Sequence, residues 1–116
     1  MKHLIHYGDV FYIRKSGKET GSEQKAGRPA VIVSNDVNNR KAPTVNVVYL
    51  SDKDPCQVTH IWLPSRGRLR GSTATCEQVT TVSKLRIGDF ITHLSVAEMN
   101  AISQGLRIQL NISTNA

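Results

Sequence analysis

The strongest constraint on the fold is that the apolar runs are short, rich in β-branched residues, and separated by glycine, proline and small polar residues. Runs of this length fit strands better than helices, because helices in globular proteins usually need ten or more residues. We therefore expect strands at residues 10–13, 30–34, 45–50, 58–63, 72–76, 79–82 and 90–92.

Only the C-terminal segment carries a helical pattern. Ser95 followed by Glu98 is a capping box, which is a signature of a helix N-terminus. An apolar stripe at three- and four-residue steps follows, formed by Met99, Ile102, Leu106 and Leu110. Gly105 weakens such a helix by roughly 1 kcal/mol relative to Ala, which predicts a close approach of neighbouring chain there. Short strands followed by one closing helix predict a small, β-barrel-like α+β domain.

Length and charge limit the function classes. At 116 residues, we expect one domain spanning 1–116. Lys and Arg number 15 against 9 Asp and Glu, for a formal net charge of +6. This balance favours an anionic partner, with nucleic acid as the first candidate. The alternative, a soluble protein that happens to be basic, stays open on charge alone.

Cysteine and histidine spacing gives no sign of a metal site. Cys56 and Cys76 are the two cysteines, and without a C-x-x-C pair we expect free thiols in a reducing compartment and neither metal nor cofactor. The N-terminus lacks the apolar run of a signal peptide. No apolar stretch is long enough to span a bilayer. We therefore expect a cytoplasmic protein that does not enter a membrane.

A long polar loop, residues 14–27, leads into the strand expected at 30–34 and delivers Arg28 to its start. Loops of this length in compact domains are usually functional. Pro29 favours an extended backbone at Arg28. A guanidinium fixed there suits a phosphate, which it can bind bidentately. The alternative is a surface arginine paired with Glu23.

Three further side chains are candidates for chemistry. Ser51 ends the most apolar strand, where its hydroxyl can donate to a phosphate oxygen or cap the following turn. His60 can shuttle protons near neutral pH, although a strand histidine beside Trp62 is more often structural. Glu77 can accept the proton of a ribose 2′-hydroxyl, or can pair with an arginine.

Arg66, Arg68 and Arg70 are spaced two apart and would share one side of an extended segment. Like charges held together favour a bridging anion, so this segment is a candidate track for backbone phosphates; the alternative is a solvated loop. Without metal ligands, phosphodiester cleavage would use the substrate's own 2′-hydroxyl, which points to RNA. Few side chains offer stacking surfaces for bases: Phe11, Tyr12, Tyr49 and Trp62 at most.

With these features in place, the chain resembles the MazF/PemK family of type II toxin–antitoxin ribonucleases. The most specific match is the string Gly21-Ser22-Glu23-Gln24-Lys25-Ala26-Gly27-Arg28-Pro29, which fits the family pattern GSEQ-x-x-x-RP followed by a strand. Further matches follow in order, from Ser34-Asn35-Asp36 through Thr59-His60 and Arg70-Gly71-Ser72 to Cys76-Glu77-Gln78. The resemblance runs from Gly8 to about Leu110.

The resemblance implies an SH3-like β-barrel of the CcdB/MazF type with a C-terminal helix, forming a homodimer. It also implies metal-independent cleavage of single-stranded RNA, usually mRNA, at a short sequence. The products would be a 2′,3′-cyclic phosphate and a 5′-hydroxyl, and the damage would inhibit translation and growth. A cognate antitoxin with an acidic tail would hold the toxin inactive.

The resemblance implies roles for the residues that stand at positions matching the family's motifs. Arg28 falls on the family's catalytic arginine, Ser51 on a position where many relatives have threonine, and Glu77 on an acidic residue that some members use. Thr75 departs from those members, which have arginine there. We expect catalysis from Arg28, Ser51, Glu77 and His60. We expect substrate binding from Gln24, Lys25, Arg66, Arg68, Arg70, Ser72 and Gln78.

Three other functions are compatible with such a barrel. A gyrase poison of the CcdB type needs a Trp-Gly-Ile end, whereas this chain finishes at residues 111–116 without tryptophan. A non-catalytic RNA- or peptide-binding barrel would bind without creating new RNA ends. An inactivated copy of the toxin would owe its loss to Ser51 or Thr75.

Overall fold

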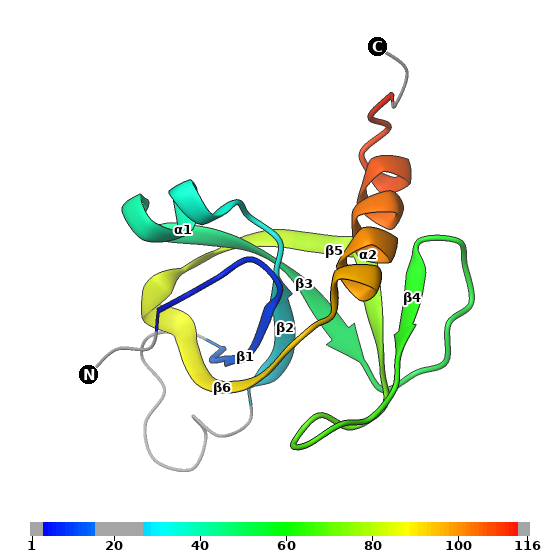
Figure 1. Ribbon diagram of the computed structural model, residues 1–116, viewed down its shortest axis with the longest axis horizontal. Helices are drawn as coiled ribbons and strands as arrows, with labels where there is room; N and C mark the ends of the chain where they lie inside the picture. The colour runs from blue at the N-terminus through cyan, green and yellow to red at the C-terminus, as the bar shows by residue number, and fades with distance from the viewer. Residues whose placement is uncertain (1–3, 16–26, 114–116) are drawn as a thin grey trace.

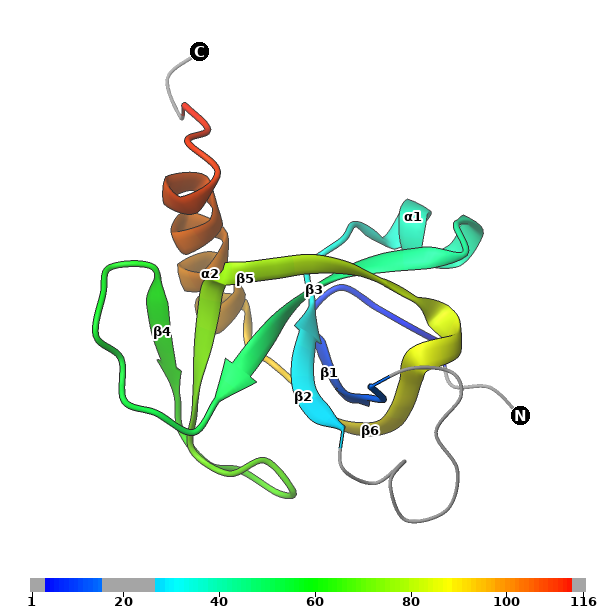
Figure 2. The ribbon, with the colours of Figure 1, turned by 180° about the vertical axis from the view of Figure 1, so that it is seen from behind.

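The structure is a computed structural model that describes residues 4–15 and 27–113. Within these residues one antiparallel six-stranded sheet has the order β4-β5-β3-β2-β1-β6. The sheet is strongly curled, and α2 stands beside β4 and β5 at one end of it (Figure 1, Figure 2). The elements are β1 (Asp9–Ile13), β2 (Arg28–Ile32), α1 (Asp36–Lys41), β3 (Thr44–Ser51), β4 (His60–Leu63), β5 (Ser72–Ser83), β6 (Ile87–His93) and α2 (Val96–Gln109).

The expected mostly β architecture with a C-terminal helix is confirmed. Hydrogen bonding leaves β4 and β6 as the two edge strands, so the sheet curls toward a barrel without closing. Neither helix in the described part of the chain is long and apolar enough to cross a membrane.

The two strands expected at 72–76 and 79–82 are one strand, β5, interrupted by a bulge. Val79 of β5 lies opposite Val48 of β3, and Ala74 lies opposite Leu50. Four residues of β5, 75–78, therefore face the single residue Tyr49. A bulge of this kind bends its strand and increases the local twist.

Helix α1 lies in the polar segment 35–43, away from the C-terminal segment that alone carries a helical pattern in the sequence. The Asn35 side chain accepts a hydrogen bond from the backbone N–H of Asn38 at 2.8 Å, which caps the helix. At six residues, the helix is too short to show an apolar repeat, so capping was its only sequence signal.

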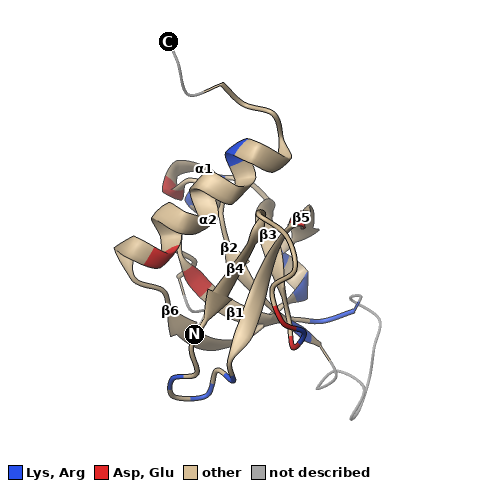
Figure 3. Cartoon of the chain, turned by 90° about the vertical axis from the view of Figure 1, so that its right-hand side faces the viewer, with Lys and Arg blue, Asp and Glu red and all other residues tan. Residues whose placement is uncertain are grey.

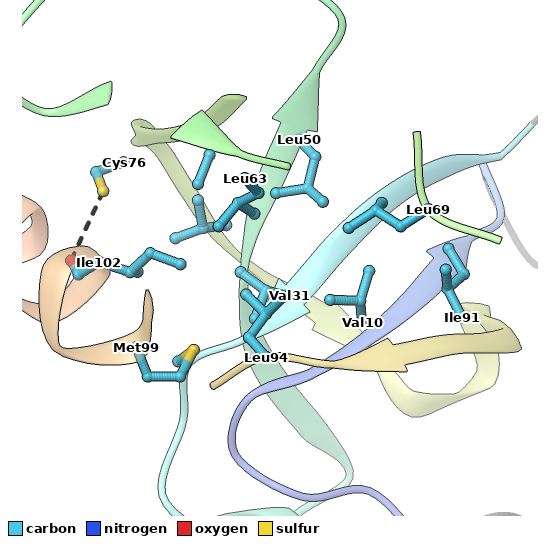
Figure 4. Packing of buried hydrophobic residues seen from close by; sticks show 12 residues of the cluster. Val10, Val31, Leu50, Leu63, Leu69, Cys76, Ile91, Leu94, Met99 and Ile102 are labelled. Atoms are coloured by element: carbon cyan, nitrogen blue, oxygen red, sulfur yellow. Dashed lines mark hydrogen bonds between the residues drawn. The ribbon is translucent and has the colours of Figure 1, made fainter. Parts of the chain in front are cut away.

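The core lies on both faces of the sheet. On β2, Val31 faces the cluster that α2 covers, whereas Ala30 and Ile32 face a second cluster inside the curl. All three are fully buried, which explains why the strand is apolar without alternation. Figure 4 shows Met99 and Ile102 of α2 reaching into the first cluster.

Helix α2 begins with the predicted capping box, in which Ser95 and Glu98 exchange hydrogen bonds. Gly105 is buried, and a Cβ atom there would lie 2.7 Å from Cys76 Sγ. The expected close approach at this glycine is thus confirmed.

Both cysteines are free thiols. Burial, with the nearby Glu77 carboxylate as the second cause, raises the pKa of Cys76 to about 11.

The basic loop between β4 and β5 folds back as a tight turn. Backbone groups of Arg66 and Leu69 exchange two hydrogen bonds, at 2.9 and 2.8 Å, and Gly67 adopts φ +49°. The segment is therefore a turn, and the extended backbone that would place all three arginines on one side does not form. Arg66 instead forms a bidentate ion pair with Glu98 of α2, with Nη1 to Oε1 at 2.6 Å. Hydrogen bonds from Arg66, with a smaller contribution from the Ser95 N–H, lower the pKa of Glu98 to about 2.

The Gly105–Cys76 contact predicts that Gly105→Ala destabilises the protein despite alanine's better helix propensity. The helix gains roughly 1 kcal/mol while overpacking costs about 1–3 kcal/mol, so we expect a net loss of roughly 1 kcal/mol. Urea unfolding measures this. In a Cys76→Ala background the same change should be neutral or stabilising, and an equal loss in both backgrounds would contradict the contact.

The Arg66–Glu98 pair predicts an acid-sensitive contribution to stability. Because the pKa of Glu98 falls from 4.5 to about 2 on folding, the contribution is complete above about pH 4.5 and is lost as pH falls toward 2. In the Glu98→Gln variant, the urea midpoint should therefore change less between these pH values than it does in the wild type. Asp89→Asn is the matched control, since Asp89 faces Arg68 of the same loop at 3.9 Å but is 81% exposed. An identical acid slope in wild type and Glu98→Gln would contradict the assignment.

Candidate active site

An open cavity of about 540 Å³ lies at one end of the sheet, lined by β1, β2, β3, β6 and the β4–β5 loop. Three arginines and two serines line it, with one carboxylate, Asp52. Figure 3 shows several basic segments along the loop that joins β4 to β5. The cavity is therefore electropositive and suits an anionic ligand. Its polar side chains are Arg28, Arg68, Arg70, Ser51, Ser72 and Asp52, and its apolar ones include Leu50, Leu69 and Ile91.

Arg28 is the first residue of β2, so the strand itself fixes its backbone. The guanidinium Cζ lies 4.6 Å from the centre of the Tyr49 ring. One guanidinium nitrogen also donates to Gln78 Oε1 at 3.2 Å and to the Leu50 carbonyl at 3.4 Å. These partners are all neutral. Within the described residues no carboxylate pairs with Arg28, so none of them neutralises its charge. Glu23, the alternative partner, lies outside the described residues.

Ser51 ends β3 and lines the same cavity. Its Oγ accepts a hydrogen bond from the Lys53 N–H at 3.1 Å, which is the turn-capping role considered above. That bond uses a lone pair of the oxygen and leaves the hydroxyl hydrogen free to donate. Capping and donation to a phosphate are therefore compatible in Ser51.

His60 and Glu77 form a pair across β4 and β5, with His60 Nε2 2.8 Å from Glu77 Oε2. His60 Nδ1 lies 3.1 Å from the backbone nitrogen of Cys56. Because a backbone N–H only donates, Nδ1 is an acceptor, so in the neutral ring Nε2 carries the hydrogen and donates it to Glu77. The side-chain nitrogen of Gln57 lies 3.0 Å from the same Nε2, and as a donor it is directed to the Glu77 carboxylate, whose pKa it also lowers. Burial raises the pKa of Glu77, but hydrogen bonds, chiefly from His60, outweigh it, and the net pKa is below the usual value.

The bulge in β5 brings these groups onto one side of the sheet. In a regular strand, adjacent residues such as Glu77 and Gln78 point to opposite faces. Here Gln78 contacts Arg28 of β2 while Glu77 contacts His60 of β4. The bulge lets both side chains reach neighbours on the Tyr49 face, because it breaks the alternation at 75–78.

The other predicted binding residues differ in position. Arg68 and Arg70 line the cavity, and Arg68 also donates to the Phe90 carbonyl at 3.2 Å. Arg66 is engaged by Glu98 and does not line the cavity. Ser72 lines it, but its hydroxyl donates to the Arg70 carbonyl at 2.6 Å. Gln24 and Lys25 lie outside the described residues. The roles assigned to all these residues stay predictions.

Two residues that the sequence singles out for other reasons have supporting roles that it did not predict. Tyr49 places its ring under Arg28, and strand alternation would have put it on the same face as Ser51. Thr75 is buried, and its hydroxyl donates to the Tyr49 carbonyl at 2.7 Å. Thr75, which stands where some members of the resembled family have arginine, therefore braces the backbone at the bulge.

No cluster of three His, Cys, Asp or Glu side chains with the geometry of a metal site occurs among the described residues. The expectation that the chemistry needs no metal stays a prediction.

Comparison of the sequence with protein families gives a match over most of the chain. Residues 6–110 fit the model of the PemK-like, MazF-like toxins of type II toxin–antitoxin systems. The chain is 32% identical to the endoribonuclease EndoA of Bacillus subtilis (strain 168), over 92% of this chain and 95% of that protein. It is also 32% identical to the endoribonuclease MazF of Staphylococcus epidermidis, over 95% and 94%.

Solved structures share the fold. A mycobacterial endoribonuclease in complex with its cognate antitoxin superposes with a TM-score of 0.77 at 24% identity, covering 93% of this chain and 96% of that one. A chain of a MazE–MazF crystal structure from Deinococcus radiodurans gives a TM-score of 0.79 at 12% identity, covering 97% of this chain and 100% of that one.

Proposed function

The chain belongs to the family of PemK-like, MazF-like toxins of type II toxin–antitoxin systems, and we propose that its arginine-lined cavity is where it cleaves single-stranded RNA. The observation that carries this is Arg28, oriented at the cavity by neutral partners. The proposal includes a single domain over residues 1–116, action on mRNA in the cytoplasm at a short sequence, and inhibition of translation as the result.

In the proposed reaction, Arg28 and Ser51 bind the scissile phosphate. The 2′-oxygen attacks phosphorus, the bond to the 5′-oxygen breaks, and a 2′,3′-cyclic phosphate and a 5′-hydroxyl form. Arg28 stabilises the added negative charge of the transition state, because oriented cations act most strongly where charge develops. It is not the base, since guanidinium stays protonated in proteins. Arg68 and Arg70 hold neighbouring phosphates.

Proton transfer is assigned to Glu77. Its carboxylate has a lowered pKa, so it is ionised and ready to accept the 2′-hydroxyl proton. His60 is assigned to positioning, because its Nδ1 is occupied by Cys56 and its Nε2–H faces Glu77. Gln78, the residue after Glu77 in β5, accepts a hydrogen bond from Arg28. The departing 5′-oxygen takes up a proton and leaves as a hydroxyl.

We also propose two protein partners, an antitoxin and a second copy of this chain. The net charge of +6 and the arginines around the cavity support an antitoxin whose acidic, partly disordered tail covers the site. A homodimer is included in the proposal, because a chain this short buries only about two-thirds of its unfolded surface and gains from covering an apolar face.

Replacing Arg28 is the first test of this function. Arg28→Ala should reduce cleavage by a factor of about 10² to 10³, because one oriented transition-state donor is lost, and Arg28→Lys should recover little since the ring contact and fork are gone. Mapping 5′-hydroxyl ends on a long RNA in excess EDTA measures this. Arg107→Ala, an exposed arginine on α2, is the matched control. Unchanged cleavage by Arg28→Ala, or cleavage by wild type only with added metal, would contradict the proposal.

The pH dependence of cleavage separates Glu77 from His60 as the base. With Glu77 as the base, Glu77→Gln should slow cleavage by a factor of about 10² or more. The acid limb of the wild-type rate profile should lie below pH 4.5, because the pKa of Glu77 is lowered from that value. Circular dichroism at each pH checks that the fold persists. An acid limb near neutral pH, where histidine ordinarily titrates, would contradict this assignment.

A further inference from the structure

One aromatic side chain of this protein is not buried by packing against the rest of the chain. Trp62 is 47% exposed, although tryptophan is usually well buried. It is the single tryptophan of the chain. The other five rings are engaged within the protein: Phe11 and Phe90 pack edge to face, Tyr49 lies under Arg28, Tyr12 packs against the core, and Tyr7 reaches Ser103 with its hydroxyl.

The sheet places Trp62 on the same face as Ser51. Trp62 of β4 lies opposite Thr73 of β5, and Thr73 lies opposite Ser51 of β3. Directly opposed residues share a face. The two strand spacings between them amount to about 10 Å. Thr73 itself is covered, because its hydroxyl donates to the Lys53 carbonyl at 2.6 Å and it is 1% exposed.

Trp62 adjoins the cavity through Gly71, which contacts the indole ring and also lines the cavity. A Cβ atom on Gly71 would lie 2.8 Å from two atoms of the indole ring, so the ring rests directly on the glycine backbone. Gly71 lines the cavity together with its neighbour Arg70 and with Arg28. An exposed indole surface thus adjoins an arginine-lined rim.

We propose that Trp62 is a stacking platform for an unpaired base of the RNA strand whose phosphates Arg70 and Arg68 hold. This inference rests on the proposed function and adds a positioning residue to it. Single-stranded nucleic acid is bound by this combination of a basic groove and aromatic faces, and stacking tolerates every base. Trp62 therefore contributes affinity and holds the strand in place beside the scissile phosphate, while other groups read the sequence.

Because Trp62 is the only tryptophan, fluorescence excited at the long-wavelength edge of its absorption, where the three tyrosines do not absorb, reports on it alone. The probe is a mixed-sequence oligoribonucleotide with 2′-methoxy groups, which lacks the nucleophile and is not cleaved. Titration should quench the emission with saturation, and an abasic oligonucleotide of equal length, carrying the same phosphates, should leave it unchanged. Equal quenching by both would overturn the proposal, since it would show that no base contacts the ring.

Variants measure the contribution to binding by anisotropy of the labelled probe. Trp62→Ala should weaken binding about 5- to 100-fold, the range for loss of one base–aromatic stack, whereas Trp62→Phe should retain most of it. Val96→Ala, an equally simple truncation of an exposed apolar residue on α2, is the matched control and should bind as wild type. Gly71→Ala should displace the ring and reduce quenching.

The outcomes separate this inference from the function it rests on. If wild type does not bind the probe at all, RNA binding itself fails. If wild type binds but Trp62→Ala binds equally well, only the role of Trp62 is overturned. If emission instead changes with protein concentration in the absence of RNA, and Trp62→Ala lowers the assembled mass, the exposed ring belongs to a protein interface and the proposal is wrong.

Discussion

The bulge in β5, where four residues oppose Tyr49 of β3, determines much of the remaining structure. It lets a single strand pair with β4 at one end and continue along β3 at the other. It also cancels the alternation of side chains, so that Glu77 and Gln78 both reach the Tyr49 face. The buried hydroxyl of Thr75 fixes the bulge by its bond to the Tyr49 carbonyl. The geometry around Arg28 is thus a consequence of strand pairing as much as of the arginine itself.

Arginines in this fold have two different uses, and their partners distinguish them. Arg66 meets a carboxylate, Glu98, in a bidentate pair that ties the β4–β5 turn to the start of α2. Arg28 meets a ring, an amide and a carbonyl, which orient it without neutralising it. A carboxylate partner would compete with a phosphate, whereas neutral partners do not. Side-chain partners therefore distinguish a structural arginine from one that we propose binds a ligand better than position in the sequence does.

Local signals predicted what local interactions determine. The capping box at Ser95, the extended backbone at Arg28 and the tight packing at Gly105 all follow from a few neighbouring residues. The bulge could not be predicted, because it depends on how β5 aligns with β3. The partner of Arg66 lies on a helix 32 residues later, and nothing near Arg66 indicates it. Helix α1 was missed because six residues are too few for periodicity, and the Cys56 contact that fixes the His60 tautomer depends on the path of a loop.

The neutral surroundings of Arg28 have a consequence for how the protein responds to ions. An arginine held in an internal ion pair already has its opposite charge within the protein, so a phosphate would have to displace that side chain before the arginine could neutralise it. No described carboxylate pairs with Arg28, so in the proposed complex it would neutralise a phosphate of the RNA, and cations condensed on the RNA would be released. The free energy of this release belongs to the solution rather than to any contact. Part of the affinity of the cavity for the proposed RNA is therefore set by the ionic strength of the solution.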